Sequence, residues 1–379
     1  MLWLMEHVLT RNLSVFLDLL RLLAALLVLL GHAGEVYGMG LPAMVGHSAK
    51  EGVAVFFVLS GFVIAFVAQS RERDWQAFAR ARALRMYSVV PLAIVVMAVC
   101  HGVGSSLHPQ AYAAGSANLN AGAMGAPPGW WPILRYLTFT NEIWFDRAMI
   151  STGAPFWSLG YEAAYYVGFA LIFYVRAGWR WIFPVLWLLV CGPRIALAFP
   201  LWLIGVATWA LVRRGCRLPA LWGAAALLAI ALAAAALRKW CAFAAMPLFE
   251  WGEPAVLAAS MGYYLVLAML LAMAIVVFAA CVPSRTIWPH WLERCARFCA
   301  GASFTLYIMH LPVMVLIAVA WPGSRGSLAG GLVAATMTVA LMFGLAELGE
   351  RRKAVYTRIF SMSSKSMRIK TKNYINVID

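Results

Sequence analysis

Arg21 and His32 are two ionisable side chains in an otherwise apolar stretch near the start of the chain. At about 100° per residue, their spacing of eleven residues puts both on one face of a helix, roughly 16 Å apart along its axis. Asp18, three residues before Arg21, is in a position to pair with the guanidinium. An ionisable group inside a membrane-spanning helix costs about 2.5–3.5 kcal/mol, so each of these groups is a candidate for function.

Glu162 and His310 are further ionisable groups in later apolar segments. Glu162 lies about two turns into its segment, at a depth comparable with that of His32. A carboxylate beside His32 would fix the tautomer of the imidazole and stabilise its protonated form, as a general base requires. The residue types leave other roles open: an interhelical hydrogen bond for His32, a structural acceptor for Glu162, or a proton relay. The role of His310 stays open.

Three arginines, Arg80, Arg82 and Arg85, occur within six residues just before another apolar segment. Three guanidinium groups this close together in the sequence are suited to binding phosphate groups. A basic loop on the cytoplasmic side of a membrane has the same composition without binding any anion, so that interpretation is open as well. The seven cysteines are spread singly with no Cys-x-x-Cys pair, which predicts neither a disulfide framework nor a metal site.

The chain as a whole is too apolar for a soluble globular protein. Of its 379 residues 64% are hydrophobic and 12% are charged, and the mean hydropathy is +0.81. Soluble domains have roughly 45–50% apolar and about 25% charged residues. The formal net charge of +15 is explained better by cytoplasmic loops and anionic membrane lipids than by a nucleic-acid partner.

Apolar stretches of bilayer-spanning length predict an all-α polytopic membrane protein with about ten transmembrane helices in one bundle. Most of the 30 lysines and arginines fall in segments on the same side as the N-terminus, so both termini are predicted to be cytoplasmic. Pro184 interrupts the short fifth stretch, which leaves eight or nine spans open, and Cys241 to Trp251 could add a partial one. The expected spans are 15–33, 52–68, 86–103, 156–175, 179–192, 195–212, 218–237, 256–281, 303–321 and 328–347.

One domain, 1–350, is predicted to hold the whole bundle, followed by a basic, disordered cytoplasmic tail, 351–379. The first apolar stretch carries ionisable residues, so we expect it to be retained as a helix rather than cleaved as a signal peptide. The one long connection, 104–155, is expected on the outer side, where it could cover a site. Its Trp130–Trp131 pair is typical of an anchor at the membrane interface.

Five segments occur in a distinctive order along the chain. They are Arg21 with His32 after ten intervening residues, Gly52–Phe62, Arg80–Tyr87, Phe156–Leu159 with Glu162, and Ser303–Pro312. Together, between Val15 and Glu347, they resemble the membrane-bound acyltransferase 3 family, the integral-membrane O-acyltransferases that modify bacterial surface and exported sugars. The chain departs from the family pattern where Ala81 separates two arginines and where Ser88 replaces an expected proline.

The resemblance implies an O-acyltransferase of the bacterial inner membrane. Its donor substrate would be acyl-CoA, most often acetyl-CoA, with no bound cofactor or metal, and its acceptor a glycan or lipid-linked sugar. His32 would serve as general base or acyl carrier, with Glu162 orienting it. The residues implied to bind acyl-CoA are Arg21, Arg80, Arg82 and Arg85, and those implied to support the site are Asp18, Ser60, Trp157, Ser158, Tyr307 and His310.

Two other classes of protein use similar residues. A secondary transporter or proton-coupled flippase would also bury His, Glu and Arg, but it would favour inverted repeats, and no convincing internal repeat is found. A structural membrane subunit would tolerate Asn or Gln at position 32. The acyltransferase interpretation is favoured, chiefly because of the resemblance.

Overall fold

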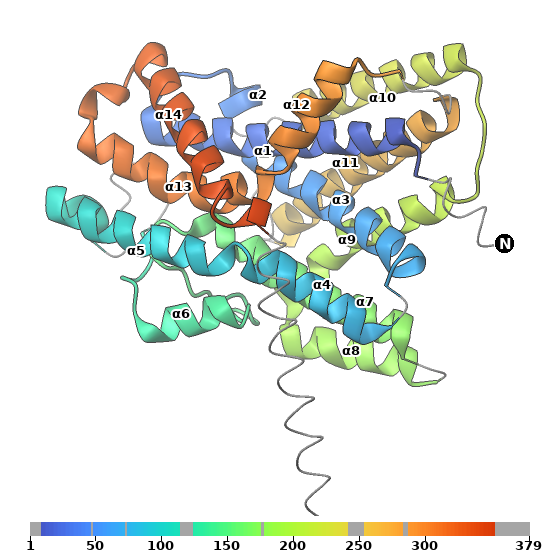
Figure 1. Ribbon diagram of the computed structural model, residues 1–379, viewed down its shortest axis with the longest axis horizontal. Helices are drawn as coiled ribbons and strands as arrows, with labels where there is room; N and C mark the ends of the chain where they lie inside the picture. Colours follow the sequence, from blue (N-terminus) through green and yellow to red (C-terminus); the bar gives the residue numbers. More distant parts are fainter. Residues whose placement is uncertain are drawn as a thin grey trace, which may run out of the picture.

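The computed structural model describes residues 9–46, 48–72, 74–113, 124–175, 178–241, 254–282 and 287–352. These residues form a bundle of α-helices with short 3₁₀ turns and no named strand within the described ranges (Figure 1). The predicted tail, 351–379, lies almost entirely outside the described residues, as do both chain ends and most of the partial span expected after Cys241.

The long helices are α1 (Arg11–Tyr37), α3 (Ala49–Ser70), α5 (Val90–Leu107), α7 (Trp157–Tyr174), α9 (Pro193–Val212), α10 (Ala220–Trp240), α11 (Pro254–Cys281), α13 (Ser303–Ala320) and α14 (Leu328–Ala346). The shorter ones are α2 (Ala43–Gly46), α4 (Trp75–Tyr87), α6 (Trp130–Leu137), α8 (Trp179–Cys191) and α12 (His290–Ala300). The 3₁₀ turns include η2 (Pro109–Tyr112), η3 (Ala154–Phe156) and η5 (Glu350–Arg352).

Eight helices in the described ranges are long and apolar enough to cross a membrane. The all-α membrane architecture is therefore confirmed, whereas the count of about ten is not. Two expected spans account for the difference. The segment 156–175 forms α7, which is outside the eight and carries a carboxylate and several tyrosines, and 179–192 forms α8, with 13 residues and an internal Pro184.

The arginine cluster lies on a helix rather than in a loop. α4 runs on into α5 across a short break at Ser88 (Figure 1). Together the two helices, Trp75 to Leu107, are one of the eight candidate membrane spans. Asp74 caps the start of α4 by accepting a hydrogen bond from the backbone N–H of Ala77. Because α4 is helical, successive arginines face different directions.

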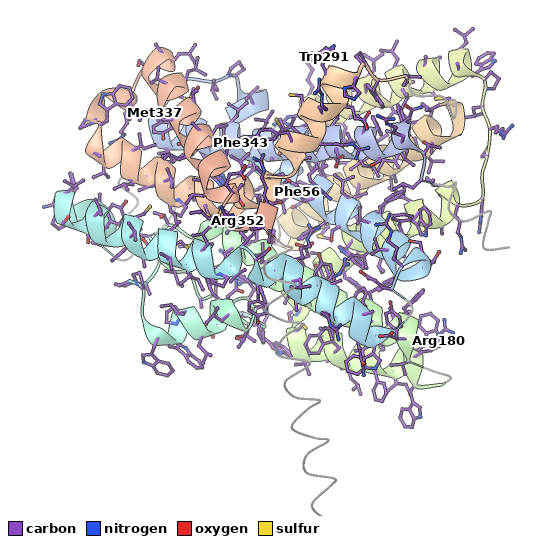
Figure 2. The ribbon with its side chains drawn as sticks, viewed as in Figure 1. Phe56, Arg180, Trp291, Met337, Phe343 and Arg352 are labelled. Carbon is purple, nitrogen blue, oxygen red and sulfur yellow. The ribbon has the colours of Figure 1, made fainter. Side chains whose placement is uncertain are left out.

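α1 and α3 form the centre of the bundle, where α1 packs against α3 and α13, and α3 packs against α1 and α9. α1 is capped at its start by the Thr10 side chain and at its end by Gly38, whose φ of 62° glycine adopts without strain. α8 and α10 lie at the periphery, with many large apolar side chains exposed as lipid contact requires. The side chains of Trp291 on α12 and Met337 on α14 also point outward (Figure 2).

Two glycines allow α3 and α9 to touch backbone to backbone. A Cβ at Gly61 would lie 2.0 Å from the carbonyl oxygen of Trp202, and a Cβ at Gly205 would lie 2.0 Å from that of Val58. Small residues at helix interfaces are the usual way in which membrane helices approach this closely. The contact fixes α3, which carries several residues of the site described below.

We expect Gly61→Ala to destabilise the protein, because the added methyl forces α3 and α9 apart. Overpacking of this kind costs about 1–3 kcal/mol. The measurement is the thermal unfolding midpoint in detergent, with Gly102→Ala on α5 as the control, because no atom lies within 4 Å of a Cβ built there. Equal midpoints for the two variants would contradict the close α3–α9 contact.

Candidate functional site

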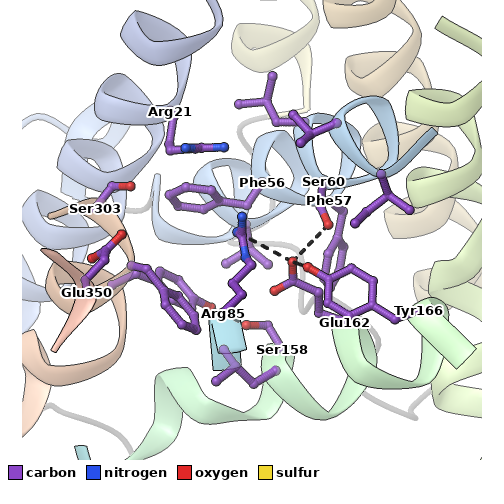
Figure 3. A pocket seen from close by; sticks show the side chains of 17 residues that line it. Arg21, Phe56, Phe57, Ser60, Arg85, Ser158, Glu162, Tyr166, Ser303 and Glu350 are labelled. Atoms are coloured by element: carbon purple, nitrogen blue, oxygen red, sulfur yellow. Dashed lines mark hydrogen bonds and ion pairs between the residues drawn. The ribbon is translucent and has the colours of Figure 1, made fainter. Parts of the chain in front are cut away.

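A small pocket opens between α1, α3, α4, α7, α13 and η5, and we call it the Arg21 pocket (Figure 3). Its cavity volume is about 70 Å³. The charged and polar residues that line it are Arg21, Ser60, Arg85, Ser158, Glu162, Tyr166, Ser303, Tyr307 and Glu350. Several elements far apart in the sequence therefore contribute charge to one enclosed space.

Arg21 points its guanidinium into this pocket without a dashed contact in Figure 3. Within the described part of the chain, no ion pair of 4 Å or less joins Arg21 to a carboxylate. The expected pairing with Asp18 is not what is found, since the Asp18 carboxylate forms its ion pair with Arg297 on α12, at 3.5 Å. Arg21 is thus a deeply placed cation with its hydrogen-bonding capacity available to a ligand.

The Glu162 carboxylate on α7 is the centre of a hydrogen-bonded cluster. Its Oε1 accepts hydrogen bonds from the Ser60 hydroxyl, at 2.9 Å, and from the Tyr166 hydroxyl. The Arg85 guanidinium lies 3.7 Å from the same oxygen. Trp202 Nε1 in turn donates to Ser60 Oγ at 3.2 Å. Ser60, expected only as a supporting residue, thereby joins α3 and α9 to the carboxylate.

The three arginines of α4 have different environments. Arg85 lines the Arg21 pocket, with its guanidinium over the Phe304 ring at 5.7 Å. Arg82 forms an ion pair with Glu72 at 2.5 Å and lines a separate, largely apolar groove between α4 and α7. Arg80 is exposed. The sequence pattern grouped all three, but the helix turns only Arg85 toward Arg21.

Glu350 is a pocket residue that sequence reasoning missed. It lies in the short turn η5, after the last long helix, and its Oε2 accepts hydrogen bonds from Thr305 N at 2.9 Å and Thr305 Oγ1 at 3.1 Å. A carboxylate at this place caps the first turn of α13. Its position at the predicted boundary between bundle and tail gave no signal that it would contact α13.

A second pocket lies beside the first, and we call it the His32 pocket. Its cavity volume is about 240 Å³. α1, α3, the segment 136–155, the start of α7 and α13 form it, and the histidine and charged residues that line it are His32, Glu35, Lys50, Glu142 and Arg147. The face shared by Arg21 and His32 on α1 therefore runs past both pockets, as their spacing predicted.

Glu142 and Arg147 come from the long connection between α5 and α7. The Glu142 carboxylate is almost fully buried and lies 3.3 Å from Arg147 Nε and 3.9 Å from Arg194 Nη1. Burial raises the pKa of Glu142 above its ordinary value, although Arg147 opposes the shift. The expectation that 104–155 could cover a site fits residues 136–155, whereas 114–123 lie outside the described residues.

His32 and His310 are in direct contact. Their facing nitrogens, His32 Nδ1 and His310 Nε2, are 3.0 Å apart. His310 Nδ1 lies 2.9 Å from the carbonyl oxygens of both Leu306 and Tyr307. Because carbonyl oxygens only accept, His310 Nδ1 must carry the proton, and Nε2 of the neutral ring must be an acceptor.

Because His310 Nε2 is an acceptor, the tautomer of His32 is determined as well. Its Nδ1 must donate, either to His310 Nε2 or to the carbonyl oxygen of Val28 at 3.1 Å. The remaining nitrogen, Nε2, then carries the lone pair that a general base requires. His310, whose role the sequence left open, orients His32 in the way that was expected of Glu162.

The expected pairing of His32 with Glu162 is therefore corrected. Glu162 is bound to Ser60 and Tyr166 and lines the Arg21 pocket, whereas His32 lines the other one. The expectation of a pair rested on similar depth along two helices, and depth does not determine the direction in which the side chains of α7 point. The two residues therefore lie in neighbouring pockets.

The two pockets meet at Val53 and Tyr307, which line both of them. The Tyr307 hydroxyl is 2.8 Å from the Ser158 hydroxyl. Trp157 lines the His32 pocket and packs edge-on against Phe57 at 6.1 Å. Ser158, Trp157 and Tyr307, predicted as supporting residues, thus lie around the junction.

A family model described as an acyltransferase domain, that of the acyltransferase 3 family, matches residues 14–347. The match spans α1 to α14 and contains both pockets except for Glu350. Neither the curated proteins nor the solved structures gave a match to the chain.

Proposed function

The chain belongs to the acyltransferase 3 family, and from this premise we propose that it transfers an acyl group, acetyl in the first instance, from acyl-CoA to a sugar hydroxyl. The acceptor would be a cell-surface or exported glycan, or its lipid-linked precursor, at a bacterial inner membrane. One observation carries the proposal: Arg21, a cation without an ion-pair partner among the described residues, and His32, a base with its lone pair available, line adjoining pockets.

The Arg21 pocket supports the donor side of the reaction. Coenzyme A carries phosphates, which guanidinium groups bind through strong charge-assisted hydrogen bonds. Arg85 adds a second guanidinium, which Glu162 holds in place. Arg80, which is exposed, would bind phosphates farther from the thioester. With its phosphates held near α4, the long pantetheine arm of the donor would extend toward the junction at Tyr307.

The His32 pocket supports the acceptor side. His32 Nε2 would take the proton of the sugar hydroxyl as its oxygen attacks the thioester carbonyl carbon. A carbon–oxygen bond forms, the carbon–sulfur bond breaks, and the proton passes from His32 to the departing thiolate. The products are an O-acyl sugar and free CoA. In an alternative route, His32 first accepts the acyl group itself and then passes it to the sugar hydroxyl. This route gives the same two products.

The proposal is tested with purified protein reconstituted in lipid nanodiscs. Acetyl-CoA and an exported-glycan fraction are added, free thiol is followed with a thiol-reactive dye, and the glycan is analysed by mass spectrometry. We expect CoA release that depends on both protein and glycan, together with a mass increment of one acetyl group. Glycan or lipid movement without thiol release would contradict the proposal and favour a transporter.

A further inference from the structure

Val53 and Tyr307 form the wall between the Arg21 pocket and the His32 pocket. We propose that these two side chains set the largest acyl group that the protein can transfer, which makes them determinants of donor specificity. The proposal rests on the function proposed above, because it concerns the passage of an acyl group from one pocket to the other. The effect that we assign to them is one of size, because both side chains stand on the wall shared by the two pockets.

The Tyr307 ring is held in place from several directions. Its side chain is only 6% exposed, and its hydroxyl shares a 2.8 Å hydrogen bond with Ser158. The Ser158 hydroxyl also lies 3.3 Å from the Pro155 carbonyl oxygen, which restrains it in turn. The Phe56 ring meets Tyr307 edge-on, with 5.3 Å between ring centroids. A ring fixed in this way gives the wall a defined position.

Val53 is fixed through its own backbone. The preceding residue is Gly52, and a Cβ there would lie 2.6 Å from Val28 Cγ2 and 2.7 Å from the Ala24 carbonyl oxygen. α3 therefore lies directly against α1 at this level. Val53 is 5% exposed and cannot retreat from the junction without separating the two helices. The wall thus has a fixed side at Val53 and a hydrogen-bonded aromatic side at Tyr307.

The transferred group must come to this wall. The thioester is delivered from the side of Arg21, and the attacking hydroxyl is activated beside His32, so the acyl carbon has to reach the boundary that separates them. Whatever is attached to that carbon must fit between Val53 and Tyr307 during transfer. An acetyl group adds only a methyl, whereas longer chains add methylenes that the close-packed wall excludes.

The test compares acetyl-, butyryl- and hexanoyl-CoA as donors and measures kcat/KM for CoA release with each. Val53→Ala removes two methyl groups from the wall. Val58→Ala, on the same helix and fully buried but lining neither pocket, is the matched control for lost volume. Val53→Leu is the second variant and enlarges the side chain at the wall. It is expected to change the donor preference in the opposite direction, so it tests the proposal even if Val53→Ala folds poorly.

We expect the wild type to prefer acetyl-CoA and Val53→Ala to raise the hexanoyl-to-acetyl ratio about tenfold or more, since one methylene in a tight pocket changes selectivity by about 10–200-fold. Val53→Leu should lower the butyryl-to-acetyl ratio, and Val58→Ala should match the wild type. Unchanged ratios in both Val53 variants, with acetyl transfer intact, overturn this proposal alone. No CoA release by the wild type from any donor overturns the proposed function itself.

Discussion

Replacement of His32 by alanine is expected to lower the rate of acyl transfer by a factor of about 10²–10⁴, the usual contribution of a positioned general base. The reason is the tautomer that His310 imposes. With Nδ1 donating, Nε2 of His32 is the nitrogen free to accept the hydroxyl proton. The variant is measured by CoA release from the purified protein and by acyl content of exported glycans in cells expressing equal amounts of each protein.

His101→Ala is the control for this variant. His101 is also a helical histidine, with Nδ1 3.0 Å from the Ser151 hydroxyl, but it lines neither pocket. It should retain most of the activity. Full acylation by His32→Ala, at normal expression and folding, would leave the family assignment intact and remove His32 from the mechanism.

Replacement of Arg21 by methionine is expected to raise the KM for acyl-CoA about 10- to 100-fold, with a smaller effect on the KM for the acceptor. A hydrogen bond to a charged group contributes about 1.5–3 kcal/mol, which corresponds to that range. Methionine keeps much of the apolar length of arginine and removes the charge. The measurement is a set of initial rates, taken first at varied concentrations of acetyl-CoA and then at varied concentrations of glycan.

Two further variants make the Arg21 result specific. Arg21→Lys keeps one charge but loses the planar fork of donors, so its KM should lie between those of the wild type and Arg21→Met. Arg213→Ala removes an exposed arginine that contacts Gln69. Arg213 lines neither pocket. The kinetics of this variant should be those of the wild type. A KM for acyl-CoA that Arg21→Met leaves unchanged would mean that the donor binds elsewhere.

The sequence predicted the features that depend on a single helix. Arg21 and His32 lie on one α-helix, α1, and reach two adjoining pockets because their spacing is close to three whole turns. The apolar stretches became helices for the same local reason. Hydrophobic length and helical period are properties of contiguous residues, so they can be read before any contact between helices is known.

Features that depend on how helices turn toward one another could not be predicted. Glu162 faces Ser60 rather than His32, and Arg82 pairs with Glu72 rather than joining Arg85 in the pocket. Rotation of a helix about its axis is set by packing, as at the Gly61 contact with α9. Glu350 lies in η5, just after α14, and bonds to the first turn of α13, a contact between helices for which apolar periodicity holds no signal.

The junction at Val53 and Tyr307 also bears on the ion permeability of the membrane. A water-filled channel through the bundle would short-circuit the ion gradients that a bacterial membrane stores, at about 2.3 kcal/mol per charge for every 100 mV. The two pockets meet at a buried valine and a hydrogen-bonded tyrosine, and these two side chains stand between the pockets. For the function proposed above, such a barrier would allow acyl transfer without an open path for ions across the membrane.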